Sequence, residues 1–339
     1  MSALPYLDAA TLERLVPVSR AVQVLEDALH AGLDPEDTPQ RPLVDLPGGQ
    51  LLMMPAAAGR YAGVKAVTVA PGNPARGLPR IQGTYLLFDG DTLAPLAAMD
   101  GMALTTLRTP AVSALAVKHL AEPDAGDLLV FGSGPQAWGH VLALHAVRPL
   151  TRVTIAGRDL ERAQALATRC QALGLPTRLA HDPLTATQPG APAPGAGALS
   201  ASSSGAFGDV TVAEAVGEAE LIVCCTTART PLFDGKLARD TVTAVAVGSH
   251  EPDARELDDD LIARSTLVVE ARSAALAEAG DVIVPLSHGT ITSGHLAGNL
   301  AELIAGRVIA GPRPRVFKSV GMAWEDLVVA AAAYEAWQA

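Results

Sequence analysis

The chain has few aromatic residues, few cysteines, an excess of negative charge and no long hydrophobic run. Only three of its 339 residues are cysteines, and their spacing matches neither a disulfide framework nor a zinc site. The formal net charge of −11 disfavours binding to nucleic acid or to anionic membranes. No apolar run reaches the roughly 18 residues that a membrane helix requires. The N-terminus lacks the basic-then-apolar order of a signal peptide, so we expect a cytoplasmic protein with no membrane or nucleic-acid partner.

The length and patterning predict an α/β protein with two domains. After Asp124, short hydrophobic runs alternate with helical segments, which is typical of a doubly wound parallel sheet. The earlier part lacks this alternation and predicts a mixed, mainly antiparallel α+β domain. We expect residues 1–118 with 312–339 to form a substrate and dimerisation domain, and 119–311 to form a Rossmann domain. Residues 183–208, rich in Pro, Gly, Ala and Ser, predict a flexible insertion in it.

A glycine-rich turn marks the start of the second domain. Residues 128–137 read LLVFGSGPQA, a hydrophobic run that breaks into Gly132 and Gly134 before a helix. The first glycine permits a tight turn, the second lets the backbone approach a pyrophosphate, and Ala137 fills the third small position. Pro135 and Gln136 open the helix, whose N–H groups suit a phosphate. This pattern, followed by a second strand, predicts dinucleotide binding, although a glycine turn kept only for packing remains the alternative.

The end of the second strand distinguishes NADPH from NADH. Enzymes that use NAD usually place an acid there, whereas this chain has Gly157 and then Arg158. A guanidinium would bind a 2′-phosphate well, so we expect NADPH. Two alternatives stay open: Arg158 is merely solvated, or Asp159 reaches back to the ribose.

Three cations of the first domain are candidates for the substrate site. Arg41 and Arg108 suit a planar carboxylate, and Lys65 lies in a strand-like run of small and branched residues. A lysine near arginines is expected to have a lowered pKa and to exchange protons near neutral pH. The helix containing Arg108 is expected to begin near Thr105, with Pro110 in its first turn. Nothing in the sequence shows that the three cations meet, and each alone is consistent with an ordinary surface cation.

The motifs LTTLRTPA and FKSVG are the most specific of several that together resemble the ornithine cyclodeaminase/μ-crystallin family. The likeness runs from about residue 38 to 337 apart from 183–208. The resemblance implies a Rossmann domain plus a dimerising substrate domain, in a homodimer. It implies that Arg41 and Arg108 hold a substrate carboxylate and that Lys65 is catalytic. It also implies that Thr226, Ser319 and Gly321 lie at the cofactor.

One departure from the family bears on the reaction. Ornithine cyclodeaminases carry an aspartate after the fourth Rossmann strand, where this chain has Arg229 in CCTTARTPLFDG. A cation there would repel the distal ammonium of ornithine and instead suits a second polar group of another substrate. No metal site is expected.

The sequence thus predicts an NADPH-dependent reductase of a C=N bond adjacent to a carboxylate, a ketimine or imine reductase. Run in reverse, the same reaction is that of an amino-acid dehydrogenase. The substrate is expected to be a small imino or amino acid. Two alternatives stay open, an NAD-dependent ornithine cyclodeaminase and a non-catalytic NADPH-binding protein like μ-crystallin.

Overall fold

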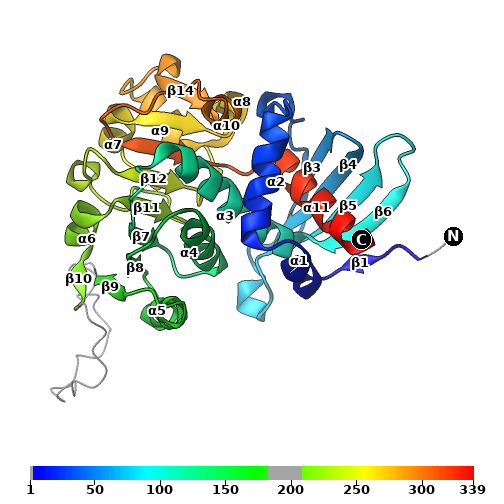
Figure 1. Cartoon of the computed structure of the whole chain (residues 1–339), viewed down its shortest axis with the longest axis horizontal. Coiled ribbons are helices and arrows are strands. Elements are labelled where there is room, and N and C mark those ends of the chain that lie inside the picture. The colour runs from blue at the N-terminus through cyan, green and yellow to red at the C-terminus, as the bar shows by residue number, and fades with distance from the viewer. Residues whose placement is uncertain (1–2, 182–207) are drawn as a thin grey trace.

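The structure is a computed structural model that describes residues 3–181 and 208–339, arranged around two β-sheets (Figure 1). The flexible insertion expected at 183–208 therefore lies outside the described residues, except for Gly208. Within the described part, no helix is both long and apolar enough to cross a membrane. Residence in the cytoplasm stays a prediction.

The larger sheet has nine strands, all parallel, in the order β10-β9-β8-β7-β11-β12-β15-β13-β14. Its central strands are short runs of Leu, Val, Ile and Ala that are buried on both faces, as a parallel sheet covered by helices requires. The order reverses direction between β7 and β11, which is where doubly wound sheets bind ligands. The predicted α/β class is confirmed. Its strands are β7 (Asp127–Phe131), β8 (Arg152–Ala156), β9 (Thr177–His181), β10 (Val210–Thr211), β11 (Leu221–Cys224), β12 (Thr243–Ala246), β13 (Thr266–Val269), β14 (Leu296–Asn299) and β15 (Arg315–Lys318).

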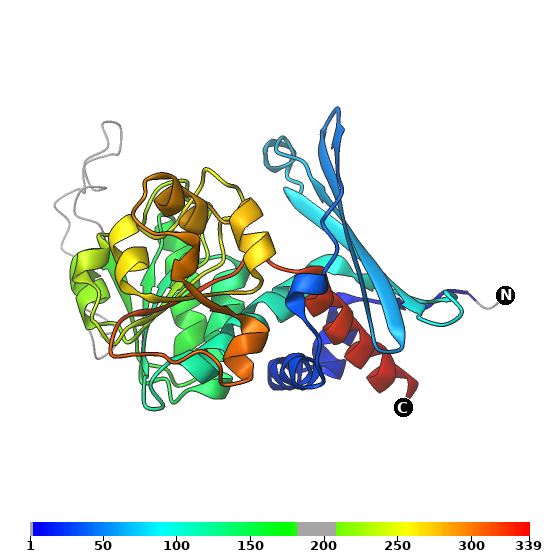
Figure 2. The ribbon, with the colours of Figure 1, turned by 90° about the horizontal axis from the view of Figure 1, so that it is seen from above.

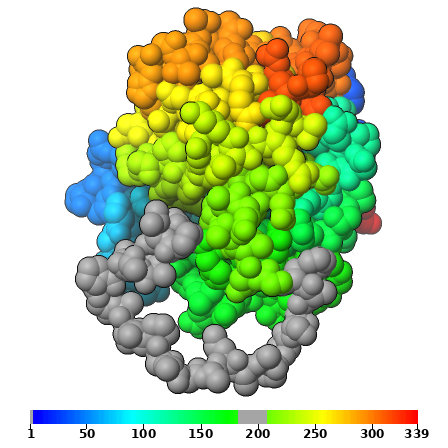
Figure 3. Space-filling model, turned by 90° about the vertical axis from the view of Figure 1, so that its left-hand side faces the viewer, coloured from blue at the N-terminus to red at the C-terminus, as the bar shows by residue number. Residues whose placement is uncertain are grey.

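Helices cover both faces of this sheet, and several of them begin at side-chain caps. Asp159 accepts a hydrogen bond from the Arg162 N–H, and Thr211 forms a capping box with Glu214. Figure 3 views the molecule from the side of β10, where green to orange segments cover most of the face. The helices are α4 (Pro135–Val147), α5 (Leu160–Ala172), α6 (Val212–Glu218), α7 (Asp259–Arg264), α8 (Arg272–Glu278), α9 (Gly280–Ser287) and α10 (Leu300–Ile304).

The smaller sheet has six strands in the order β1-β6-β5-β4-β3-β2, antiparallel except where β1 joins β6. The hairpin predicted at Asp89 to Asp91 joins β5 to β6. Side chains alternate along β4, and Lys65 points to the buried face together with Tyr61 and Val67. Helices cover one face of this sheet only (Figure 2). The elements are β1 (Tyr6–Leu7), α1 (Ala9–Leu15), α2 (Val18–His30), η1 (Pro35–Asp37), β2 (Leu43–Leu46), β3 (Gly49–Ala58), β4 (Tyr61–Val69), β5 (Ile81–Asp89) and β6 (Pro95–Asp100).

The long helix α3 (Gly101–Leu120) lies between the two sheets and corrects one prediction. The helix is capped by Asp100, whose side chain accepts hydrogen bonds from the N–H groups of Met102 and Ala103. It therefore begins four residues before Thr105, the start that the sequence predicted. Arg108 therefore lies in the interior of the helix and not beside its N-terminus. Pro110 lies inside this helix, and its ring packs closely against α4 at Gly139, where a Cβ would lie 2.7 Å from the proline Cγ.

The chain returns from the parallel sheet to the smaller sheet near its end. Residues 315–318 form β15 inside the parallel sheet, so assigning all of 312–339 to the substrate domain was wrong for this strand. A four-residue run after a proline carries too little periodicity to reveal which sheet it joins. A crossover at 319–322 then leads to α11 (Ala323–Gln338), which packs against β3, β4 and α3.

Candidate active site

The loops that follow the parallel strands meet at one edge of the sheet. Gly132 and Gly134 lie in the turn after β7, and Pro135, Gln136 and Ala137 form the first turn of α4. Gly132 has a φ of +118°. A Cβ at 132 would lie 2.8 Å from the Cys225 carbonyl oxygen, so only glycine fits beside β11. Gly134 caps α4, and no atom lies within 4 Å of where its Cβ would be. The first turn of α4 carries no acid. This open space above a helix N-terminus fits a pyrophosphate.

Two charged residues follow the end of β8: Arg158 is exposed to solvent, and Asp159 caps the next helix. The Asp159 side chain caps α5 and pairs with Arg162, with Oδ2 at 3.2 Å from its Nε. Gly157 lies close to the glycine turn, since a Cβ there would be 3.4 Å from Ser133 Oγ. Arg158 is therefore the exposed charged residue that follows this strand directly.

Thr226, after β11, is tied to a buried acid that the sequence analysis did not single out. Its N–H and hydroxyl donate to Glu256 Oε1 at 2.7 and 2.8 Å, and the Gly248 N–H donates to the other oxygen. Burial raises the pKa of Glu256. Asp281 accepts from the Glu256 N–H and pairs with Lys318 at 2.9 Å. The structure thus commits the Thr226 hydroxyl to a buried network, and a direct role at the cofactor stays a prediction.

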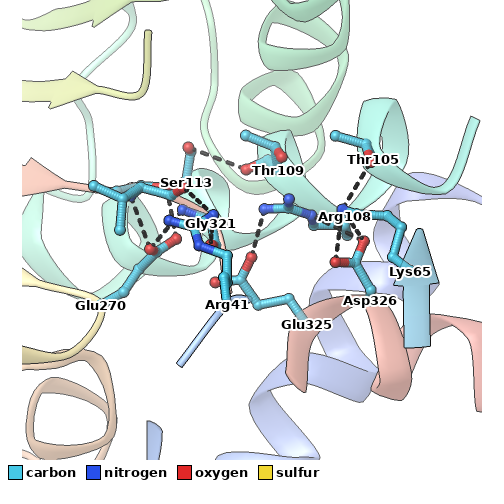
Figure 4. A network of polar contacts seen from close by, with 12 residues as sticks. Arg41, Lys65, Thr105, Arg108, Thr109, Ser113, Glu270, Gly321, Glu325 and Asp326 are labelled. Atoms are coloured by element: carbon cyan, nitrogen blue, oxygen red, sulfur yellow. Dashed lines mark hydrogen bonds and ion pairs between the residues drawn. The ribbon is translucent and has the colours of Figure 1, made fainter. Parts of the chain in front are cut away.

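The crossover after β15 is held from both sides (Figure 4). Glu270 accepts hydrogen bonds from the Ser319 hydroxyl at 2.5 Å and from the N–H groups of Val320 and Gly321 at 2.9 and 2.8 Å. Arg41 donates through Nη1 to the carbonyls of the same two residues. Gly321 has a φ of +77°, and a Cβ there would lie 2.6 Å from Arg108 Nη1. Glycine is required at 321 both for its backbone and to admit the guanidinium.

Lys65 and Arg108 meet on one buried carboxylate, Asp326 of α11. Lys65 Nζ lies 2.9 and 2.7 Å from the two Asp326 oxygens and 3.0 Å from Thr105 Oγ1. Arg108 reaches Asp326 through Nε at 3.2 Å and Glu325 through Nη1 at 2.7 Å. The structure therefore brings Arg41, Lys65 and Arg108 into one network (Figure 4).

Burial and neighbouring charges shift the pKa values in this network. Burial lowers the pKa of Lys65 to about 8, against the opposing attraction of Asp326. The pKa of Arg108 is raised, because the two carboxylates outweigh its burial. The pKa of Glu325 is raised well above its ordinary value by burial and by the nearby Glu270. The pKa of Lys65 therefore lies close to neutral pH.

Arg229 lies outside this network. Its side chain is 54% exposed and pairs with Glu251 and Asp253, each at 2.6 Å. Its predicted contact with a second polar group of the substrate stays a prediction. Among the described residues, no cluster of His, Cys, Asp or Glu could hold a metal ion.

Four acids that were not predicted from the sequence complete the site: Glu270, Glu278, Glu325 and Asp326. The signal available was the pair Glu325-Asp326 in the first turn of the last helix, where negative charge is favourable in any helix. Helix stabilisation alone explains two acids at that position, so it conceals their pairing with Arg108 and Lys65. Those partners lie 217 and 261 positions away, and such pairing leaves no pattern in the local sequence.

The sequence model of the ornithine cyclodeaminase/mu-crystallin family matches residues 9–189 and 207–339. The chain belongs to this family. It is 36% identical over 290 residues to the Delta(1)-pyrroline-2-carboxylate reductase of Bacillus cereus (strain ATCC 10987 / NRS 248), covering 84% of this chain and 80% of that one.

Two solved structures share the fold of this family member over nearly its whole length. The Delta(1)-pyrroline-2-carboxylate reductase of Thermococcus litoralis, in complex with NADH and L-proline, matches with a TM-score of 0.85 and 29% identity over 99% of this chain and 98% of that one. An archaeal alanine dehydrogenase dimer with bound NAD matches with a TM-score of 0.84 and 25% identity, over 99% and 96% of the two chains.

Proposed function

We propose that this protein reduces the C=N bond of a cyclic imino acid whose carboxylate is attached to the imine carbon. The observation that carries the proposal is the network of Lys65, Arg108 and Arg41 beside the loops that fit a dinucleotide. Reductases of Delta(1)-pyrroline-2-carboxylate among the relatives favour this reaction over cyclodeamination. The test is loss of NADPH absorbance on adding Δ1-pyrroline-2-carboxylate, and no loss across five- and six-membered cyclic imino acids would refute it.

Each residue of the site has a different role in the proposed reaction. Arg41 binds the carboxylate through two parallel donors, and Arg108 contributes Nη2, since its Nε and Nη1 stay with Asp326 and Glu325. Lys65 donates a proton to the imine nitrogen and becomes neutral, which a pKa of about 8 allows near neutral pH. The glycine turn and the first turn of α4 would hold a reduced nicotinamide dinucleotide, which would supply the hydride for the imine carbon. Asp326 positions Lys65 and Arg108 together through its two oxygens.

The cofactor is a nicotinamide dinucleotide, and we propose NADPH rather than NADH. Arg158 is exposed at the end of β8, and Asp159 is engaged with α5, so the charge that faces a ribose phosphate is positive. Replacing Arg158 by alanine is expected to raise the KM for NADPH about 10- to 100-fold, as the loss of a charge-assisted contact predicts. The KM for NADH, measured on the same variant, is expected to change little. Equal changes for both cofactors would contradict this role.

We also propose a homodimer formed through the open face of the six-stranded sheet. That face lies opposite the helices (Figure 2). The strand register and burial place half-buried Val64, Leu86 and Phe88 and exposed Met53 on it. An apolar sheet face of this kind is typical of an interface. Sedimentation velocity tests the proposal, with Val64→Glu expected to yield monomers.

A further inference from the structure

An ion pair between Arg41 and Glu278 joins the two sheets across their junction. Arg41 precedes β2 of the six-stranded sheet, and Glu278 ends α8 beside the parallel sheet. We propose that Glu278 competes with the substrate carboxylate for Arg41, and so lowers the affinity of the site for carboxylates and promotes their release. This inference rests on the proposed role of Arg41 as a carboxylate ligand.

The contact has the geometry that a bound carboxylate would adopt. Arg41 Nε donates to Glu278 Oε1 at 3.3 Å, and Nη2 pairs with Oε2, so both oxygens meet one edge of the guanidinium. Nη1 is occupied by the carbonyls of Gly321 at 3.1 Å and Val320 at 3.4 Å. A substrate carboxylate that needs the Nε and Nη2 edge must therefore displace Glu278.

The pair is exchangeable, unlike the other ion pairs of the site. The side chains of Arg41 and Glu278 are 17% and 31% exposed, whereas those of Glu325 and Asp326 are fully buried. Water can therefore replace either partner of the first pair during exchange, while breaking the buried pairs would leave uncompensated charges. Arg108 thus keeps its partners, and Arg41 is the guanidinium that can change partner.

The surroundings of both residues favour such an exchange. Arg41 precedes Pro42, which restricts its backbone to extended conformations, so the change of partner is a rotation of the side chain. Glu278 is the last residue of α8, where a negative charge opposes the helix dipole, and that last turn holds no basic residue. The position is therefore unfavourable for α8 itself, and Arg41 is the partner that compensates Glu278.

The experiment compares binding of pyrrole-2-carboxylate, a planar carboxylate without a reducible C=N bond, to the protein saturated with NADP+. In Glu278→Gln the dissociation constant is expected to fall about three- to tenfold, the size of a partly exposed ion pair. In Glu13→Gln, which removes the same charge from an exposed position on α1, it is expected not to change. An unchanged or raised constant in Glu278→Gln overturns the proposal, because a residue that merely props Arg41 would weaken binding when removed.

A double-mutant cycle locates the effect at Arg41. In an Arg41→Gln background, Glu278→Gln is expected to change probe affinity less than twofold, and a persistent gain overturns competition at Arg41. Turnover of Δ1-pyrroline-2-carboxylate by the unmodified protein is measured separately. Absent turnover with the expected pattern of probe binding refutes the proposed function alone. Turnover without tightening in Glu278→Gln refutes this inference alone, and so does a probe that binds none of the variants.

Discussion

Replacing Lys65 by alanine is expected to reduce imine reduction about 10²- to 10⁴-fold, the usual contribution of a positioned acid. NADPH binding is expected to persist, because Lys65 lies in β4 and the glycine turn follows β7. The measurements are single-turnover rates and a fluorescence titration of the cofactor. Lys236→Ala, at an exposed position, is the matched control. Turnover within a few-fold of the unmodified protein would remove Lys65 from the mechanism.

The same substitution is expected to remove a limb of the pH profile. Reduction requires the charged lysine, so its rate is expected to fall as pH rises through about 8, the pKa of Lys65. Oxidation of the amino acid requires the neutral lysine, so its rate is expected to rise through the same pH. A limb that persists in Lys65→Ala would belong to another group or to the substrate.

Replacing Arg108 by leucine is expected to lower the free energy of unfolding by about 3–5 kcal/mol, because buried Glu325 loses its cationic partner and buried Asp326 keeps only Lys65. Both Glu325 and Asp326 are fully buried and bonded to this guanidinium. Denaturant unfolding gives the change, with Arg14→Leu on the exposed side of α1 as the control. Binding of pyrrole-2-carboxylate is expected to weaken in parallel.

The pH dependence of the unfolding free energy of Arg108→Leu distinguishes the loss of an ion pair from a packing defect. Without Arg108 the pKa of Glu325, already raised, rises further above its value in the unfolded chain. A group of that kind favours the folded state at low pH and loses that contribution as pH rises through its folded pKa. The deficit of Arg108→Leu is therefore expected to be smaller at pH 5 than at pH 8, whereas a cavity alone would cost the same at both.

The predictable part of the site came from patterns with a local cause. The glycine turn after β7 was recognisable because a strand, Gly132, Gly134 and a helix start follow one another within ten residues. The three cations were predicted from their chemistry and from the resemblance to the family. The start of α3 was predicted near Thr105, too late in the chain, because a proline at 110 suggested the first turn of a helix. The ring of that proline packs beside Gly139 on another helix, a neighbour that no property of residues 101–120 reveals.

By itself the sequence determined the alternation of strands and helices, the glycine turn and the identity of the cations, since these depend on neighbours in the chain. Only the tertiary structure decided which charges compensate them. Asp326 neutralises Lys65, Glu325 neutralises Arg108 and Glu278 neutralises Arg41, over separations of 217 to 261 positions. The physical reason is that the pKa of Lys65 and the freedom of Arg41 depend on burial and on distances of about 3 Å through space, which periodicity along the chain does not encode.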